Sequence, residues 1–150
     1  MIVAIKREKG VSVRILIVDD EPAFRKIMKR VLIRDGHSVY LARDGKEGLK
    51  ILASEEIDIV FTDINMPEMG GWEFLQQVHA LYPKLPAAVI TGLPSHETRP
   101  ANAPPSAERI LRKPVRINEI RELIEELQYR FFLLCKSYIN HRLISLYCAD

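Results

Sequence analysis

The sequence lacks most features of membrane-bound or disulfide-rich secreted proteins. Its 150 residues contain no run of about 18 apolar residues, the length that a membrane-spanning helix needs. The chain begins with five apolar residues, which are followed at once by Lys6 and Arg7. This apolar stretch is too short for a secretory signal, and the basic residues come after it instead of before it. The two cysteines, Cys135 and Cys148, provide neither a disulfide framework nor a Cys-x-x-Cys metal spacing. We therefore expect a cytoplasmic protein without a membrane span.

A large excess of either charge is also missing. The chain has 22 basic and 20 acidic residues, a net charge of +2. Residues 1–10 and 128–150 carry +2 each, whereas residues 11–127 carry −2. A slightly acidic body has no electrostatic footprint for DNA or RNA, so we expect no direct nucleic-acid binding. The length and the hydrophobic share of 47% are typical of one globular domain with a short appendage.

Short apolar runs alternate with helical patterns along most of the chain. The runs that predict strands are 14–18, 38–42, 57–62, 87–90 and 109–112. Apolar residues at spacings of three and four predict the helices 21–34, 44–54 and 72–82 between the first four runs. Strands that alternate with helices predict a parallel sheet with helices on both faces.

The connection before the fifth strand breaks this regularity. Four prolines fall within twelve residues: Pro94, Pro100, Pro104 and Pro105. Because each proline inside a helix costs about 3 kcal/mol, we expect an irregular fourth crossover over residues 92–107, with at most one helical turn. Beyond the fifth strand, apolar residues over 117–134 alternate steps of three and four, which predicts one long C-terminal helix.

Reactive side chains stand at the ends of four of the five predicted strands. They are Asp19 and Asp20, Asp63, Thr91 and Lys113, in strand order. In an open parallel sheet, ligands bind outside the carboxyl ends of the strands, so these groups are expected to meet. Three carboxylates at one edge repel each other and imply a cation. A site with only oxygen ligands favours a hard ion such as Mg²⁺, which keeps waters that a phosphate can replace.

This set of groups suits chemistry at phosphorus. An aspartate can act as the nucleophile, while the metal and Lys113 would neutralise charge on the phosphoryl oxygens. The hydroxyl of Thr91 can donate one hydrogen bond to such an oxygen.

The motifs at these strand ends resemble the receiver domain of two-component response regulators, over roughly residues 12 to 127. They are Asp19-Asp20, Asp63-Ile-Asn-Met-Pro67, Thr91-Gly92 and Lys113-Pro114. The intervals of 43, 28 and 22 residues between Asp20, Asp63, Thr91 and Lys113 fall where the family places them. The resemblance implies a flavodoxin-like, doubly wound α/β fold with a five-stranded parallel sheet in the order 2-1-3-4-5.

The resemblance also implies a metal-binding and phosphorylation site. Asp63 would accept a phosphoryl group from a histidine kinase or a histidine phosphotransfer protein. Asp20 and Asp63 would bind Mg²⁺ directly, together with the backbone carbonyl of Asn65, and Asp19 would act mostly through water.

Two further residues would serve the phosphoryl group. Thr91 and Lys113 would hold its oxygens, and the bond from Lys113 to Pro114 is usually cis in the family. Such a protein catalyses its own phosphorylation and dephosphorylation and is not a turnover enzyme. An aspartate-based phosphatase is disfavoured, because such enzymes place a second aspartate where this chain has Asn65.

The sequence departs from the family in its output region. Ile110 stands where the family usually has an aromatic residue that swings inward after phosphorylation. Together with the irregular fourth crossover, this leaves a second hypothesis open: a receiver-like adaptor or phosphate sink that does not use the aromatic switch. The apolar Leu93, two residues after Thr91, suggests slow hydrolysis of the phosphoryl group.

Two segments and two motifs have alternative interpretations. Residues 1–11 form an N-terminal leader without an assigned role, and 128–150 form a C-terminal helical extension after the receiver domain at 12–127. The extension would pair two copies of the chain or pack onto the receiver, unless it is a truncated or non-native tail. The basic helix 21–34 is either a solvated face or a docking face for a phosphodonor. Asp19-Asp20, taken alone, would suit a helix cap.

Overall fold

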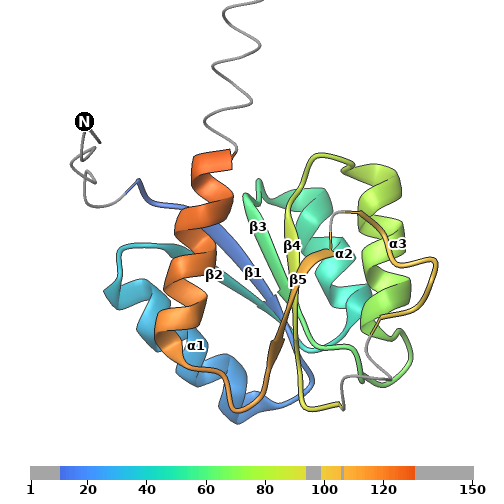
Figure 1. The fold of residues 1–150 in the computed structure, drawn as a ribbon, viewed down its shortest axis with the longest axis horizontal. Helices are drawn as coiled ribbons and strands as arrows, with labels where there is room; N and C mark the ends of the chain where they lie inside the picture. The colour runs from blue at the N-terminus through green and yellow to red at the C-terminus, as the bar shows by residue number, and fades with distance from the viewer. Residues whose placement is uncertain (1–10, 94–98, 106, 131–150) are drawn as a thin grey trace, which may run out of the picture. The chain divides into compact units, whose positions relative to one another are not determined.

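The computed structural model describes residues 11–93, 99–105 and 107–130. Its elements follow one another as β1 (Arg14–Val18), α1 (Pro22–Arg34), β2 (Ser38–Ala42), α2 (Gly45–Ser54), β3 (Ile59–Thr62), α3 (Gly71–Leu81), β4 (Ala87–Thr91) and β5 (Ala107–Arg112) (Figure 1). A further helix occupies residues 117–130. The chain forms two compact units, Met1–Pro114 and Val115–Asp150.

The five strands form one parallel sheet in the order β2-β1-β3-β4-β5. Helix α1 covers one face of the sheet, and α2 and α3 cover the other (Figure 1). The predicted fold class and strand order are therefore confirmed. In a parallel sheet of this order, the ends of β1, β3, β4 and β5 lie along one edge, so the residues after them become neighbours.

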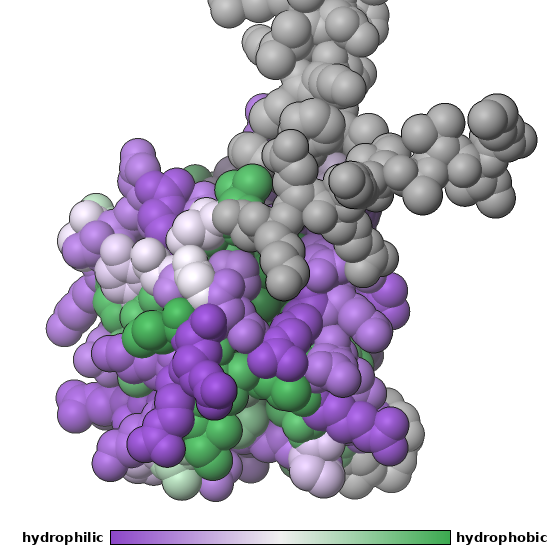
Figure 2. All heavy atoms as spheres, turned by 90° about the vertical axis from the view of Figure 1, so that its left-hand side faces the viewer, coloured by the Kyte–Doolittle hydropathy of each residue, from purple (hydrophilic) through white to green (hydrophobic). Residues whose placement is uncertain are grey.

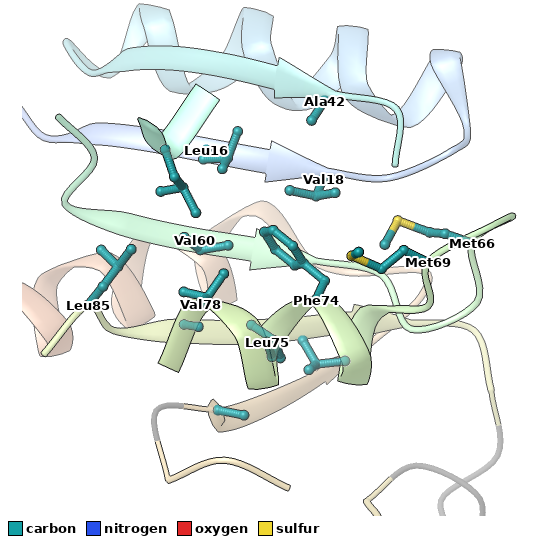
Figure 3. Packing of buried hydrophobic residues seen from close by; sticks show 14 residues of the cluster. Leu16, Val18, Ala42, Val60, Met66, Met69, Phe74, Leu75, Val78 and Leu85 are labelled. Carbon is teal, nitrogen blue, oxygen red and sulfur yellow. The ribbon is translucent and has the colours of Figure 1, made fainter. Parts of the chain in front are cut away.

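Apolar side chains that alternate along the strands form the core under α2 and α3. Leu16, Val18 and Val60 of the sheet pack with Phe74 and Val78 of α3 (Figure 3). All five are fully buried, and burying a side chain of this size contributes about 1.5–3 kcal/mol. This packing fixes α3 against the strands that carry the reactive side chains.

Helix α2 begins with a side-chain cap. The Asp44 side chain accepts a hydrogen bond of 2.8 Å from the backbone N–H of Glu47. The Glu47 carboxylate in turn accepts one of 2.7 Å from the backbone N–H of Arg43. These reciprocal bonds satisfy amides that the helix itself leaves without partners.

Two strands begin at other residues than the sequence predicts. β3 begins at Ile59 rather than at 57. The residue before it, Asp58, accepts hydrogen bonds with its carboxylate from Arg14 at the start of β1, with distances of 2.8 Å to both the backbone N and Nη2. β5 begins at Ala107 rather than at 109. There the backbone N–H of Ala107 donates to the carbonyl of Pro104 over 3.0 Å, and Arg99 donates to the carbonyl of Ala107 over 2.7 Å.

The described part of the fourth crossover is irregular. Residues 99–105 form turns without a helix, as the prolines predict. Residues 94–98 and 106 lie outside the described residues, so the single helical turn allowed there is not tested.

The helix at 117–130 belongs to the second unit. Its buried residues Ile120, Leu123, Ile124 and Leu127 keep the predicted spacing of three and four. The end of the predicted helix, residues 131–150 of the apolar extension and both cysteines lie outside the described residues. Among the described helices, none is long and apolar enough to cross a membrane.

Candidate functional site

Two carboxylates and one ammonium group meet at the carboxyl edge of the sheet. Lys113 follows β5, and its Nζ lies 2.7 Å from Oδ2 of Asp19 and 3.2 Å from Oδ2 of Asp63. Asp19 follows β1, and Asp63 follows β3. The side chain of Lys113 thus contacts Asp19, which lies 94 positions earlier in the chain, and Asp63, which lies 50 positions earlier.

Backbone hydrogen bonds continue the sheet just beyond the strand ends and fix these residues. The N–H of Asp19 donates to the carbonyl of Ala42 over 3.0 Å, and the N–H of Asp63 donates to the carbonyl of Val18 over 2.9 Å. The N–H of Lys113 donates to the carbonyl of Thr91 over 2.9 Å. The reactive side chains therefore start from backbone that the sheet itself positions.

A third carboxylate completes an acidic cluster. One oxygen from each of Asp19, Asp20 and Asp63 lies within 4.8 Å of the others. Asp19 is 1% exposed and Asp63 is 8% exposed, whereas Asp20 is exposed. Lys113 neutralises one of the three negative charges. The two negative charges that remain would be balanced by a divalent cation. Because the donor atoms are all carboxylate oxygens, the cluster fits a hard ion such as Mg²⁺.

The two oxygens of Asp63 have different partners. Oδ1 accepts hydrogen bonds from the backbone N–H groups of Ile64, over 2.6 Å, and Asn65, over 3.3 Å. Oδ2 faces Lys113. Asn65 lies exposed in the β3–α3 loop directly after this carboxylate.

The start of α3 approaches Asp63 closely and requires a glycine. A Cβ at Gly71 would lie 2.0 Å from the backbone carbonyl oxygen of Asp63, which is far inside van der Waals contact. The N–H of Gly71 donates to the carbonyl of Ile64 over 2.8 Å. These contacts set the shape of the β3–α3 loop that follows Asp63.

Lys113 is held by more than the two aspartates. Its Nζ lies 4.3 Å from the centre of the Phe24 ring and 3.6 Å from the exposed carboxylate of Glu21. Burial tends to lower the pKa of Lys113, but the hydrogen bonds and charges of Asp19 and Asp63 outweigh it and leave the pKa raised. The ammonium group therefore stays charged at neutral pH.

Burial dominates the environment of Asp19. It raises the pKa of this carboxyl group, and the hydrogen bond from Lys113 opposes the shift. Oδ1 of Asp19 accepts a hydrogen bond of 2.8 Å from the N–H of Glu21, while Arg25 donates to the Asp19 carbonyl over 2.5 Å. Glu21 is the N-cap residue of α1, without a side-chain cap. The interpretation of Asp19-Asp20 as a helix cap is therefore wrong, since the Asp19 side chain is used before the helix begins and on Lys113.

Thr91 ends β4 as a fully buried residue. Its hydroxyl oxygen accepts a hydrogen bond of 3.2 Å from the N–H of Leu93. The peptide bond between Lys113 and Pro114 is cis, as the resemblance implies. Ile110, at the position of the usual aromatic residue, is half-buried and packs against the apolar cluster on the α3 side of the sheet.

Two contributors to the site, Phe24 and Arg25, are not indicated by the motifs at the strand ends. Their positions in the chain could have indicated them, because both lie within six residues of Asp19, in the first turns of a helix that begins at the same sheet edge.

Comparison with known proteins agrees with this geometry. Residues 15–125 match the family model of the response regulator receiver domain. The chain is 39% identical over 108 residues to the response regulator MprA of Mycolicibacterium vanbaalenii, covering 72% of this chain and 47% of that protein. The chain thus spans about half the length of the curated relatives it matches.

Solved structures show the same fold. The response regulator TrrA of Thermotoga maritima, solved with Mg²⁺ and BeF, is 30% identical with a TM-score of 0.70, covering 77% of this chain and 98% of that chain. A CheY-like receiver domain protein of Methanospirillum hungatei is 32% identical with a TM-score of 0.70, covering 80% and 99%.

A doubly wound parallel sheet with an acidic, lysine-bridged carboxyl edge defines the class: a flavodoxin-like α/β signalling domain. Within that class, the chain belongs to the response regulator receiver domain family of two-component signalling. Proteins of this family are signalling proteins and not classical enzymes.

Proposed function

We propose that the chain is an Mg²⁺-dependent phospho-acceptor and that Asp63 receives the phosphoryl group from a histidine kinase or a histidine phosphotransfer protein. A carboxylate oxygen of Asp63 forms a bond to phosphorus, the bond from phosphorus to the donor's imidazole nitrogen breaks, and the freed imidazole takes a proton from solvent. The product is an acyl phosphate that changes the surface seen by a partner. A cytoplasmic location is part of the same proposal.

The bridge made by Lys113 carries this proposal. Its ammonium group lies within hydrogen-bond distance of both buried aspartates. It stands where a phosphoryl group on Asp63 would add negative charge, and Thr91 at the end of the next strand offers a hydroxyl donor.

Mg²⁺ would be held by Asp20 and Asp63 directly, by the backbone carbonyl of Asn65, and by Asp19 through water. When bound, the ion would neutralise charge on the phosphoryl oxygens. In this proposal, the acidic cluster restrains the ion, while Lys113 and Thr91 orient the phosphoryl group.

Helix α1 supplies a docking face for the phosphodonor in this proposal. Ile27 and Ile33 are 61% and 49% exposed among the basic residues Lys26, Lys29 and Arg30. Figure 2, which views the molecule from the α1 side, shows hydrophobic residues among hydrophilic ones. Exposed isoleucines beside basic side chains give this face both apolar contact area and charge, a combination that suits a protein partner.

Mass spectrometry after incubation with acetyl phosphate and Mg²⁺ tests the proposal. We expect a gain of about 80 Da on the wild-type chain and none on Asp63→Asn. Asp58→Asn is a matched control, because it removes a carboxylate at the opposite end of the sheet and should keep the adduct. An adduct that survives Asp63→Asn, or none on the wild-type chain, contradicts the proposal.

A receiver-like adaptor or phosphate sink is the second candidate. The half-buried Ile110 favours it, because an aliphatic side chain packed in the apolar cluster cannot swing as an aromatic switch does. Amide chemical shifts with and without acetyl phosphate and Mg²⁺ separate the two. In a phosphate sink, we expect the chemical-shift changes to be confined to residues beside Asp63. In a signalling receiver, we expect them also on β4, β5 and the surface around these strands.

Pairing of two copies through the C-terminal extension stays a prediction. Residues 131–150 of this segment lie outside the described residues, and the absence of nucleic-acid binding is likewise untested.

A further inference from the structure

The turn that follows β4 is tied to the exposed end of β5. Arg112, the last residue of β5, donates a hydrogen bond from its guanidinium group to the backbone carbonyl of Leu93. The N–H of the same Leu93 donates to the hydroxyl oxygen of Thr91 over 3.2 Å. One residue thus links the buried hydroxyl to an exposed arginine.

We propose that Arg112 is a positioning residue for Thr91. By holding the carbonyl of Leu93, it fixes the turn whose N–H orients the Thr91 hydroxyl. It thereby sets how readily a phosphoryl group on Asp63 is held and lost. This inference rests on the proposed function and deepens it.

The chemistry of the hydroxyl supports the proposal. A threonine hydroxyl has one hydrogen to donate and two lone pairs that accept. The N–H of Leu93 occupies one lone pair, and no hydrogen bond donated by this hydroxyl is present among the described residues. Its hydrogen therefore stays available for an oxygen at the sheet edge. Because the hydroxyl hydrogen turns about the Cβ–Oγ1 bond, a partner on the oxygen restricts the direction in which the hydrogen points.

The sheet makes Arg112 suited to this role. Thr91 and Arg112 are paired across β4 and β5, and the next residue, Lys113, donates its N–H to the carbonyl of Thr91 over 2.9 Å. The last residue of β5 and the residue after it thus fix both sides of Thr91: Lys113 holds its carbonyl, and Arg112 holds the turn bonded to its hydroxyl. The half-buried Ile110 has no polar group with which to do this, whereas the exposed Arg112 also presents a charged surface to partners.

The proposal separates Arg112 from the other arginine of β5. Arg109 is paired with Ala88, three residues before Thr91, and it is also exposed. Removing either side chain changes the net charge by the same amount, so Arg109→Ala is the matched control for Arg112→Ala. Arg112→Lys keeps one donor for the carbonyl and is the conservative variant.

The experiment follows two signals in the full chain. After loading with acetyl phosphate and Mg²⁺, we expect the rate of phosphoryl loss to change about three- to tenfold in Arg112→Ala, a shift of the size that one hydrogen bond produces. We expect less than about twofold in Arg109→Ala and partial return to the wild-type rate in Arg112→Lys. Equal rates in the two alanine variants overturn the proposal.

The second signal needs no phosphate. The amide resonance of Leu93 and the side-chain rotamer of Thr91, measured by nuclear magnetic resonance, should change in Arg112→Ala and stay as in the wild type in Arg109→Ala. Unchanged Leu93 and Thr91 signals refute the positioning role whether or not Asp63 accepts phosphate. Failure of the wild-type chain to take up phosphate, with these signals changed as expected, would count against the proposed function alone.

Discussion

The ammonium group of Lys113 lies 4.3 Å from the centre of the Phe24 ring. The ring approaches from the first turns of α1, and the lysine comes from the end of β5, so the contact joins two elements that are far apart in the sequence. A cation over an aromatic face is attracted by the negative charge of that face. Phe24 therefore helps to hold the ammonium group between Asp19 and Asp63.

Replacing Phe24 by leucine should loosen this lysine. We expect Phe24→Leu to lower the free energy of unfolding by about 0.5–1 kcal/mol, the usual worth of such a contact near the surface. Phe24→Tyr keeps the aromatic face and should match the wild type. Urea unfolding curves measure both, and an equal loss in the two variants would indicate a packing effect instead.

Replacing Lys113 by methionine should leave two buried carboxylates without their cation. Removing one partner of a buried ion pair typically lowers stability by about 3 kcal/mol or more. We expect a loss of that order for Lys113→Met at neutral pH, against almost none for Lys29→Met on the exposed side of α1. Thermal unfolding followed by circular dichroism provides the measurement, and similar midpoints for the two variants would speak against the buried bridge.

Magnesium should stabilise the folded chain through the acidic cluster. A ligand that binds only the folded state adds about 1.4 kcal/mol at ten times its Kd. We expect Mg²⁺ to raise the unfolding midpoint of the wild type and to have a much smaller effect on Asp20→Asn, which removes the most exposed of the three carboxylates. The same shift in both proteins would mean that the ion binds elsewhere.

Gly71 should tolerate no side chain. An added Cβ would meet the carbonyl oxygen of Asp63 at 2.0 Å, and backbone cannot yield as a flexible side chain can. We expect Gly71→Ala to lower the free energy of unfolding by about 1–3 kcal/mol, as overpacking usually does. Gly92→Ala is the control, because its Cβ would meet nothing within 4 Å. Equal stability of the two variants in urea would contradict the close approach.

The pair Arg14 and Asp58 should make stability depend on acid. The hydrogen bond from Arg14 lowers the pKa of Asp58. A carboxyl group whose pKa is lower in the folded state stabilises above its unfolded pKa of about 4 and loses that effect as pH falls through its folded pKa.

Urea titrations across pH test this dependence. The wild type should be more stable than Asp58→Asn at pH 5 to about 8, and the difference should shrink towards zero below about pH 4. Glu56→Gln, in which the carboxylate is 86% exposed, should show a smaller difference. A gap between the wild type and Asp58→Asn that stays constant in acid would show that ionisation of Asp58 plays no part.

The sheet and the main groups of the site could be predicted because they depend on short-range signals. Continuous apolar runs identify β1 and β4, and in a parallel sheet the residues after each strand share one edge, so Asp19, Asp63 and Lys113 follow from the strand ends alone. The contacts of Phe24 and Arg112 could not be predicted in this way. They depend on where side chains of neighbouring elements reach after the helices have packed.

Strand boundaries also escaped prediction for a physical reason. The apolar run 57–62 includes Ile57 and Asp58 in a strand, whereas the structure begins β3 at Ile59 and uses the carboxylate of Asp58 to bind Arg14 at the start of β1. At β5, the backbone turn from Pro104 to Ala107 extends the strand backwards, and no property of those residues taken singly indicates it.

The two amide hydrogen bonds to one oxygen of Asp63 make its carboxylate asymmetric. Rotation about the bond between Cβ and Cγ would break both, so the group behaves as a fixed plane and not as a freely turning one. The two oxygens are then chemically distinguishable, and in the proposed phosphorylation the incoming phosphoryl group would meet the same one each time. Little ordering entropy would be left to lose in that reaction, an advantage that the folded backbone has already provided.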